Sequence, residues 1–153
     1  MRGPLQVAAV LVGVGEHPER VRRRLVPDDA QMQILLGSLL GMARIHGVPG
    51  ERRVHIGDRP ERADYVWWKY ERLIAFTECA PAVLGDRIGF RTIAHPLFDD
   101  LAPLFHPRRP ARSRVVRELL GPLGLAVWMT DAGRLQLRAD LFLPTQRGVS
   151  LCA

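Results

Sequence analysis

Residues 31–43 carry two glycines inside an apolar stretch with helical spacing. A helix start is marked just upstream by Pro27-Asp28-Asp29, because carboxylates bind the exposed amides of a first turn. Gly37 and Gly41 lie one turn apart on this helix, where glycine lowers helix propensity but removes the Cβ atoms that hold a neighbouring helix away. The segment therefore predicts a helix packed closely against a second helix, with a buried face formed by Met32, Leu35, Leu36, Leu39 and Leu40.

The remainder of the sequence alternates short hairpins with helices. Turn residues predict one hairpin across Pro49-Gly50-Glu51 and a second across Gly85-Asp86. The last helical region is bent at Gly121-Pro122. This order predicts an α+β fold with an antiparallel sheet. The expected strands are 44–48, 52–57, 82–84 and 88–93, and the expected helices after the first are 58–76, 97–105 and 115–130.

The two faces of the predicted sheet differ in chemistry. Side chains alternate between the faces of a strand, so one face carries isoleucine, valine and phenylalanine while the other carries arginine and histidine. A solvated face would normally mix both signs of charge. A face of one sign favours contact with phosphates or base edges, and arginine suits guanine O6 and N7. The candidate DNA-contacting residues on this face are Arg44, His46, Arg53, His55, Arg87 and Arg91.

The net positive charge of the sequence is compatible with a polyanionic partner but does not require one. The 153 residues include 22 Lys+Arg against 16 Asp+Glu, and Lys69 is the only lysine. Guanidinium groups grip phosphates bidentately, although an arginine surplus also follows from GC-rich coding. Cys79 and Cys152 are too few for a disulfide framework or a cysteine zinc site, which favours a reducing compartment. We expect a cytoplasmic protein, associated with the nucleoid if it is bacterial.

The amino-terminal residues predict neither a membrane span nor a folded domain. Residues 5–14 are apolar but fall short of the roughly 20 residues that span a bilayer, so no membrane partner is expected. Residues 16–24 are polar and basic, which is typical of a surface arm or linker that could also lie along a phosphate backbone. A basic arm is therefore expected at 1–26.

Several motifs, in the same order, resemble the LAGLIDADG homing endonucleases. Leu35-Leu36-Gly37-Ser38-Leu39-Leu40-Gly41-Met42-Ala43 is similar to the family's first motif, FGSLLGDG. Leu125-Ala126-Val127-Trp128-Met129-Thr130-Asp131-Ala132-Gly133 is similar to its second, LAIWFMDDG. Between them, residues 65–71, 91–98 and 119–123 resemble YLEWKYE, RFSTISHPIF and LLTPL. The resemblance implies motif helices, packed through Gly37, Gly41 and Ala126, on a concave antiparallel β-saddle that lies in the DNA major groove.

The resemblance also implies Mg²⁺-dependent cleavage of double-stranded DNA, but the metal-binding acids are replaced. The family acid at the eighth motif position corresponds here to Met42 and Ala132, neither of which offers the oxygen ligand that Mg²⁺ requires. Asp131 is adjacent, yet one residue along a helix turns a side chain by about 100°. We therefore predict a double-stranded DNA-binding protein without nuclease activity and without a metal cofactor, whose backbone contacts are extended by Arg108, Arg109 and Arg112.

Other functions remain open at this point. An active endonuclease would use Asp131 as its catalytic acid, with Mg²⁺ as cofactor. The chain could also be an RNA-binding splicing helper, or a remnant with no nucleic-acid partner. His46 and His55 could face each other across the first hairpin, but two histidines without a third ligand favour base contact over metal binding.

The domain organisation predicted from the resemblance is one complete half-saddle followed by part of another. Residues 27–121 form the first half, in the order αββαββα, and residues 122–153 form the second motif helix and an incomplete second half. A strand at 135–141 would leave an unpaired edge unless a partner or the amino-terminal apolar segment covers it. A homodimer formed through the motif helices is one way to complete the saddle.

Overall fold

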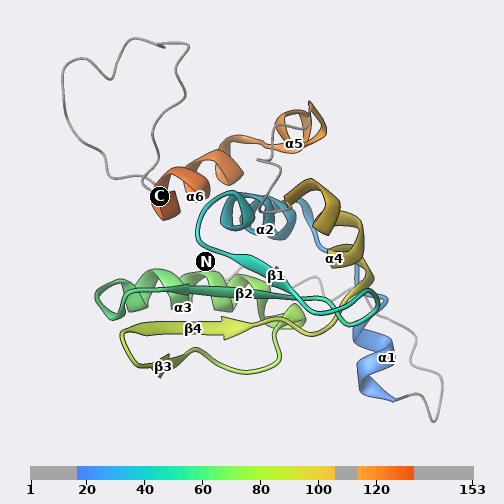
Figure 1. The fold of residues 1–153 in the computed structure, drawn as a ribbon, viewed down its shortest axis with the longest axis horizontal. Helices are drawn as coiled ribbons and strands as arrows, with labels where there is room; N and C mark the ends of the chain where they lie inside the picture. The colour runs from blue at the N-terminus through green and yellow to red at the C-terminus, as the bar shows by residue number, and fades with distance from the viewer. Residues whose placement is uncertain (1–16, 106–113, 133–153) are drawn as a thin grey trace, which may run out of the picture.

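A four-stranded antiparallel sheet, covered on one face by helices, lies along the lower side of the molecule in Figure 1. The computed structural model describes residues 17–105 and 114–132. The strand order is β1-β2-β4-β3, so the two hairpins lie side by side through β2 and β4. The expected α+β class is confirmed. The strands are β1 (Arg44–His46), β2 (Arg53–Asp58), β3 (Ala82–Leu84) and β4 (Arg87–Arg91).

The helices follow the predicted order, with small differences at their ends. Asp28 and Gln31 form a capping box at the start of α2, as the acidic run predicted. The expected helix from Asp58 is a 3₁₀ turn followed by α3, and the expected break at Gly121-Pro122 separates α5 from α6. The α-helices are α1 (Pro18–Arg22), α2 (Asp29–Leu40), α3 (Ala63–Leu73), α4 (Pro96–Leu101), α5 (Arg114–Leu119) and α6 (Pro122–Ala132). None of the helices in the described ranges is long and apolar enough to cross a membrane.

The hydrophobic core lies between the sheet and the helices. Strand β2 contributes Val54 and Ile56, and β4 contributes Ile88 and Phe90, all of them buried. Helix α3 packs on β2 and β4, and its buried Val66 and Leu73 belong to the same cluster. The buried part of α2 consists of consecutive residues, not of a single stripe, because α2 has the sheet below it and α6 above it (Figure 1).

Helices α2 and α6 approach at their glycines, as the glycine pair predicted. A Cβ atom on Gly37 would overlap the carbonyl oxygen of Gly124, and one on Gly41 would overlap the side chain of Asp131. Ala126 was expected at this interface, and that expectation is wrong. Residues three and four apart share a helix face, so the face containing Gly124, Val127 and Asp131 is buried while Ala126 is exposed.

The break between α5 and α6 is stabilised by a buried glutamine of α2. Gln33 Nε2 donates to the carbonyl of Leu119 at 2.8 Å, and its Oε1 accepts from the amide of Gly121 at 2.6 Å. A helix that ends and restarts leaves such backbone groups without partners, and burying them unpaired costs stability. Gln33 therefore fixes the point at which α6 begins relative to α2.

The polar segment after residue 16 was expected to be an arm or linker, and within the described residues it instead forms α1 and packs on the body. Arg22 donates to the carbonyls of Ala75 and Thr77, and Arg23 donates to the carbonyl of Gly50. Main-chain carbonyls accept hydrogen bonds from arginine, as phosphates do. The sequence alone therefore does not show whether these arginines bind the protein's own main chain or a phosphate backbone. The expected apolar segment 5–14 lies outside the described residues.

The turn between β1 and β2 is held from two sides. Besides Arg23, the carboxylate of Asp99 in the first turn of α4 accepts the Gly50 amide at 3.1 Å. Gly47 and Gly50 adopt positive φ angles of 103° and 86°, which glycine tolerates without strain. The hairpin that carries His46 and Arg53 is thus anchored to the helical layer.

Replacing Gly37 with alanine tests the close approach of α2 and α6. In an open helix this change raises helix propensity and stabilises by about 1 kcal/mol. Here the new methyl meets a backbone carbonyl that cannot rotate away, so we expect a loss of about 1–3 kcal/mol in the free energy of unfolding, measured by urea denaturation.

Ala126→Leu is the matched control, since it adds volume to the exposed face of α6 and should change stability by less than about 0.5 kcal/mol. Equal or greater stability of Gly37→Ala would contradict the tight crossing.

Candidate nucleic-acid interface and motif-helix site

The candidate DNA face is the side of the sheet that the helices leave open. The register pairs Arg44 with His55, His46 with Arg53, and His55 with Arg91, so side chains of one chemistry lie opposite each other across β1, β2 and β4. Directly paired residues point to the same side of a sheet. The structure therefore brings together five of the residues that the alternation pattern selected, Arg44, His46, Arg53, His55 and Arg91. Arg87 is on the same face but lies beyond Gly89, opposite Leu84 of β3.

The middle of this face has no side chains. Gly57 of β2 and Gly89 of β4 are direct partners in the register and lie between the two basic ends. Arg87 folds over this position, and its Nη2 donates to the Gly57 carbonyl at 3.3 Å. Glycine in a strand interior permits another backbone to approach closely. The centre of the face thus has no Cβ atoms, and the Arg87 guanidinium lies against its main chain.

A carboxylate that the sequence reasoning missed lies within the basic set. Glu78 Oε2 accepts a hydrogen bond from Arg53 Nη1 at 2.7 Å and forms an ion pair with Arg91, whose Nε lies 2.5 Å away. Its amide also donates to the Arg91 carbonyl at 3.0 Å, which fixes its position beside the end of β4. Glu78 follows the 3₁₀ turn Ile74–Phe76 and precedes β3, so no strand alternation could have placed it on this face.

His46 and His55 do face each other across the first hairpin. Their ring centroids lie 4.4 Å apart. Burial lowers the pKa of His55, and the charges of His46, Arg91 and Arg53 lower it further against an opposing effect of Glu78. The described residues contain no group of three or more histidine, cysteine, aspartate or glutamate side chains that could hold a metal ion. The two rings therefore lie in contact on this face.

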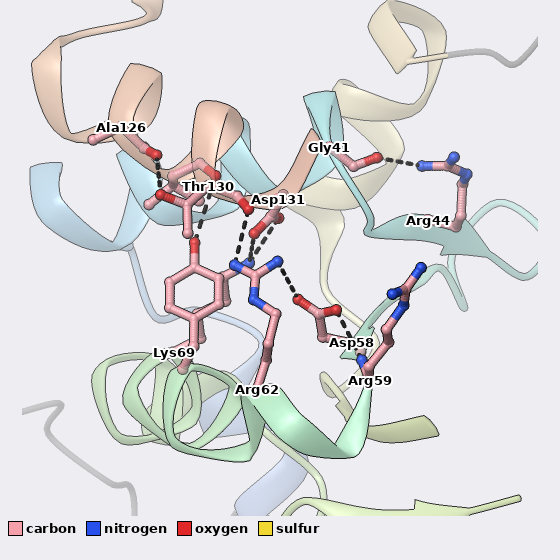
Figure 2. Close-up of polar contacts among 12 residues, drawn as sticks. Gly41, Arg44, Asp58, Arg59, Arg62, Lys69, Ala126, Thr130 and Asp131 are labelled. Atoms are coloured by element: carbon pink, nitrogen blue, oxygen red, sulfur yellow. Dashed lines mark hydrogen bonds and ion pairs between the residues drawn. The ribbon is translucent and has the colours of Figure 1, made fainter. Parts of the chain in front are cut away.

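The first motif position follows directly after the end of α2. Met42 comes after the helix cap Gly41 and is 37% exposed. Arg44 turns back toward the helix end, where its Nη1 donates to the carbonyls of Gly41 at 2.9 Å and Ala43 at 2.7 Å (Figure 2). A cation at a helix carboxyl terminus stabilises the unpaired carbonyls. The charge beside the first motif position is thus a guanidinium.

The residues at the two motif positions do not fit Mg²⁺. This hard cation needs oxygen ligands in octahedral geometry. Met42 supplies a thioether, and Ala132, at the end of α6, supplies a methyl group. The neighbouring carboxylate, Asp131, points away from the helix end into the interior, as the rotation of one helical residue requires (Figure 2).

Asp131 instead forms a buried ion pair with the only lysine of the sequence. Both carboxylate oxygens lie 2.7 Å from Lys69 Nζ, and the two side chains are 1% and 3% exposed. Burial lowers the pKa of Lys69, and the carboxylate opposes this shift. The ring of Tyr65 lies 4.5 Å from the ammonium, and its own pKa is raised by burial and by Asp131. The pair joins α6 to α3. Asp131 can lie against α2 at this point because Gly41 has no side chain.

A second cation links the same elements at the edge of the pair. Arg62 Nη2 donates to the carbonyl of Thr130 at 2.8 Å, near the end of α6. Its Nη1 lies 2.9 Å from the largely buried carboxylate of Asp58, the last residue of β2 (Figure 2). The end of α6 is therefore held to the sheet and to α3 by two cations, Lys69 and Arg62.

Some expected residues lie outside the described parts of the chain, and some important ones were not expected. Arg108, Arg109 and Arg112, and the strand expected at 135–141, fall in the undescribed ranges. The sequence signal for Lys69 was available, because a single lysine in an arginine-rich chain points to a position where guanidinium does not fit. Gln33 and Glu78 gave no such signal.

Comparison with known proteins identifies the family. A model of the LAGLIDADG DNA endonuclease family matches residues 32–150, so the chain belongs to this family. The solved structure of the homing endonuclease I-WcaI bound to its DNA recognition sequence has the same fold, with a TM-score of 0.60 and 16% sequence identity. The match covers 80% of this chain but 60% of that one, so the chain spans less than two thirds of its structural relative. No curated protein sequence matches this chain.

The buried pair predicts a strongly non-additive mutant cycle. Lys69→Met leaves an unpaired buried carboxylate and Asp131→Leu leaves an unpaired buried ammonium, so each should lower the free energy of unfolding by about 3–5 kcal/mol in thermal and urea unfolding. The double variant leaves no charge, and we expect it to recover most of that loss.

Arg114→Ala, which breaks an exposed pair with Glu118, is the control and should cost less than about 1 kcal/mol. Additive losses in the double variant would show that Lys69 and Asp131 do not act as a pair.

Proposed function

We propose that this chain binds double-stranded DNA through the open face of its sheet and does not cleave it. The observation that carries the proposal is the face itself, where arginines and histidines of β1, β2 and β4 lie side by side on the side that the described helices leave uncovered. Family membership supports the kind of partner, since the fold is that of an endonuclease family acting on DNA. Arginine donors on such a face suit both phosphates and guanine edges.

The absence of cleavage in this proposal follows from the donor set. The family resemblance implies that hydrolysis depends on Mg²⁺ held by an acid at each motif position. The side chains at these positions, Met42 and Ala132, contain no oxygen. Asp131 could bind a metal ion only by leaving Lys69, which would leave a buried ammonium unpaired at a cost of several kcal/mol. The charged group beside the end of α2 is instead the Arg44 guanidinium.

The proposal also covers assembly. In our domain scheme, residues 27–121 form the half that contacts DNA and residues 122–153 begin a second half. Because α2 is already covered by α6, a homodimer would use the opposite face of α6, where Leu125 and Met129 are 43% and 50% exposed. A second copy seated there would place two basic faces on one duplex, which increases the effective concentration of the second face.

The test is binding to duplex DNA at several salt concentrations, with mass measured by light scattering on the same samples. Six to eight phosphate contacts predict a slope of about −5 to −7 for the logarithm of affinity against the logarithm of salt. Arg44→Ala and Arg87→Ala, at two positions of the face that do not bind Glu78, should each reduce that slope by about 1, while Arg114→Ala, away from the face, should not.

A flat salt dependence, or a clear preference for structured RNA, would overturn DNA binding as the function. Incubation with Mg²⁺ or Mn²⁺ should leave the duplex intact, and metal-dependent cleavage would overturn the second half of the proposal.

DNA affinity should also rise as the pH falls. The pKa of His55 lies below its usual value in the free protein, so its imidazole is neutral near pH 7. A bound polyanion stabilises the imidazolium, so binding takes up a proton and is tighter between about pH 7.5 and 5.5 as the pH is lowered. His55→Gln should flatten this dependence, and His17→Gln, on the exposed start of α1, should not. An affinity independent of pH in the unmodified chain would exclude a role for His55.

A further inference from the structure

The position of Glu78 distinguishes between two ways in which an arginine face can bind DNA. A face of free guanidinium groups grips phosphates and carries little sequence information. Here Arg53 and Arg91 share one carboxylate oxygen, so the trio has a net charge of one cation instead of two. A phosphate approaching either arginine also approaches the Glu78 carboxylate, which repels it. This end of the face is therefore poorly suited to non-specific backbone contact.

The atoms that Glu78 uses leave a defined set of donors on each arginine. Arg91 is bound through Nε, which leaves its terminal amino groups Nη1 and Nη2 for a second partner. Arg53 is bound through Nη1, which leaves Nε and Nη2. Both sets are pairs of parallel N–H donors, the geometry that matches guanine O6 and N7. The side chain of Arg91 is 53% exposed, so these donors reach solvent.

The main chain that carries Glu78 is itself held in place. The Glu78 amide donates to the Arg91 carbonyl, and the neighbouring Thr77 bridges to Thr92 in antiparallel pairing. The segment before β3 is thus tied to the end of β4 by its main chain. Because Glu78 is fixed, the two guanidinium groups lose little further freedom on binding, which is the advantage of preorganised recognition.

We propose that Glu78 is a specificity-determining positioning residue, which holds Arg53 and Arg91 as a fixed pair of guanine-reading donors and weakens contact with phosphates. This inference rests on the proposed DNA binding and adds to it the class of target, a duplex with guanine in the major groove at the β2 and β4 end of the face. Glu78 does not touch the DNA in this scheme and acts through the two arginines.

The experiment compares the full chain with Glu78→Gln, Glu78→Asp and the matched control Glu118→Gln. Glu118 also binds an arginine Nε, that of Arg114 at 2.6 Å, but on α5 away from the sheet. Affinity is measured for a randomised duplex pool and for a duplex recovered from that pool by selection with the unmodified chain. The selected duplex is also tested with 7-deazaguanine, which lacks the N7 acceptor.

Glu78→Gln should bind the random pool more tightly, with a salt slope steeper by about 1–2, because two guanidinium groups become free to contact phosphates. Its preference for the selected duplex should fall by about tenfold, the cost expected for losing one bidentate guanine contact. Glu78→Asp keeps the charge but is too short to reach both arginines, so it should lose preference with little change in salt slope. Glu118→Gln should match the unmodified chain in every measurement.

Two further readouts separate positioning from a general loss of structure. The pKa of His55, followed by NMR, should fall in Glu78→Gln because Glu78 raises it, while the melting temperature changes little. The 7-deazaguanine penalty should be large for the unmodified chain and small for Glu78→Gln. An unchanged preference in Glu78→Gln, or an equal loss in Glu118→Gln, would overturn this inference alone. Failure of the unmodified chain to bind any duplex would overturn both this inference and the proposed function.

Discussion

The contact of α2 with α6 at two glycines is the constraint on which the remaining structure depends. Gly37 lies against the main chain of Gly124, and Gly41 lies against Asp131. On the α6 side, a Cβ atom on Gly124 would overlap the Gln33 side chain, so the observed rotation of α6 depends on glycine at this position. That rotation turns Asp131 inward to Lys69 and places Ala132 at the helix end. The packing of α6 on α2 therefore also determines which side chain of the second motif lies at the helix end.

The interior and the open face of the sheet use different cationic side chains, lysine in the interior and arginine on the face. The buried site uses lysine, whose compact ammonium is enclosed by one carboxylate and one aromatic ring. The face uses arginine, whose planar group can bind Glu78 on one edge and keep donors on the other. A buried guanidinium would need more acceptors than Asp131 offers, and a surface ammonium would not present paired donors.

Much of the fold was readable from the sequence because the deciding signals are local. Capping at Asp28, alternation along β2, and the break at Gly121-Pro122 each depend on a few adjacent residues, and each is found as expected. The misplaced Ala126 shows the limit. The motif gave the helix but not its rotation, which depends on contacts with α2. Glu78 and Gln33 act on residues 13 to 88 positions away, and no local pattern encodes such pairings.

The solitary lysine also determines how the charge of this protein can be regulated. Lys69 is the only lysine in the sequence, and it is buried against Asp131. Acylation of side-chain amines, a common way to neutralise DNA-binding surfaces, has no target on the arginine face. Guanidinium groups stay charged at any physiological pH, so the cationic character of the face is permanent. Among the described residues, its strength depends on His55 and on the carboxylate that Arg53 and Arg91 share.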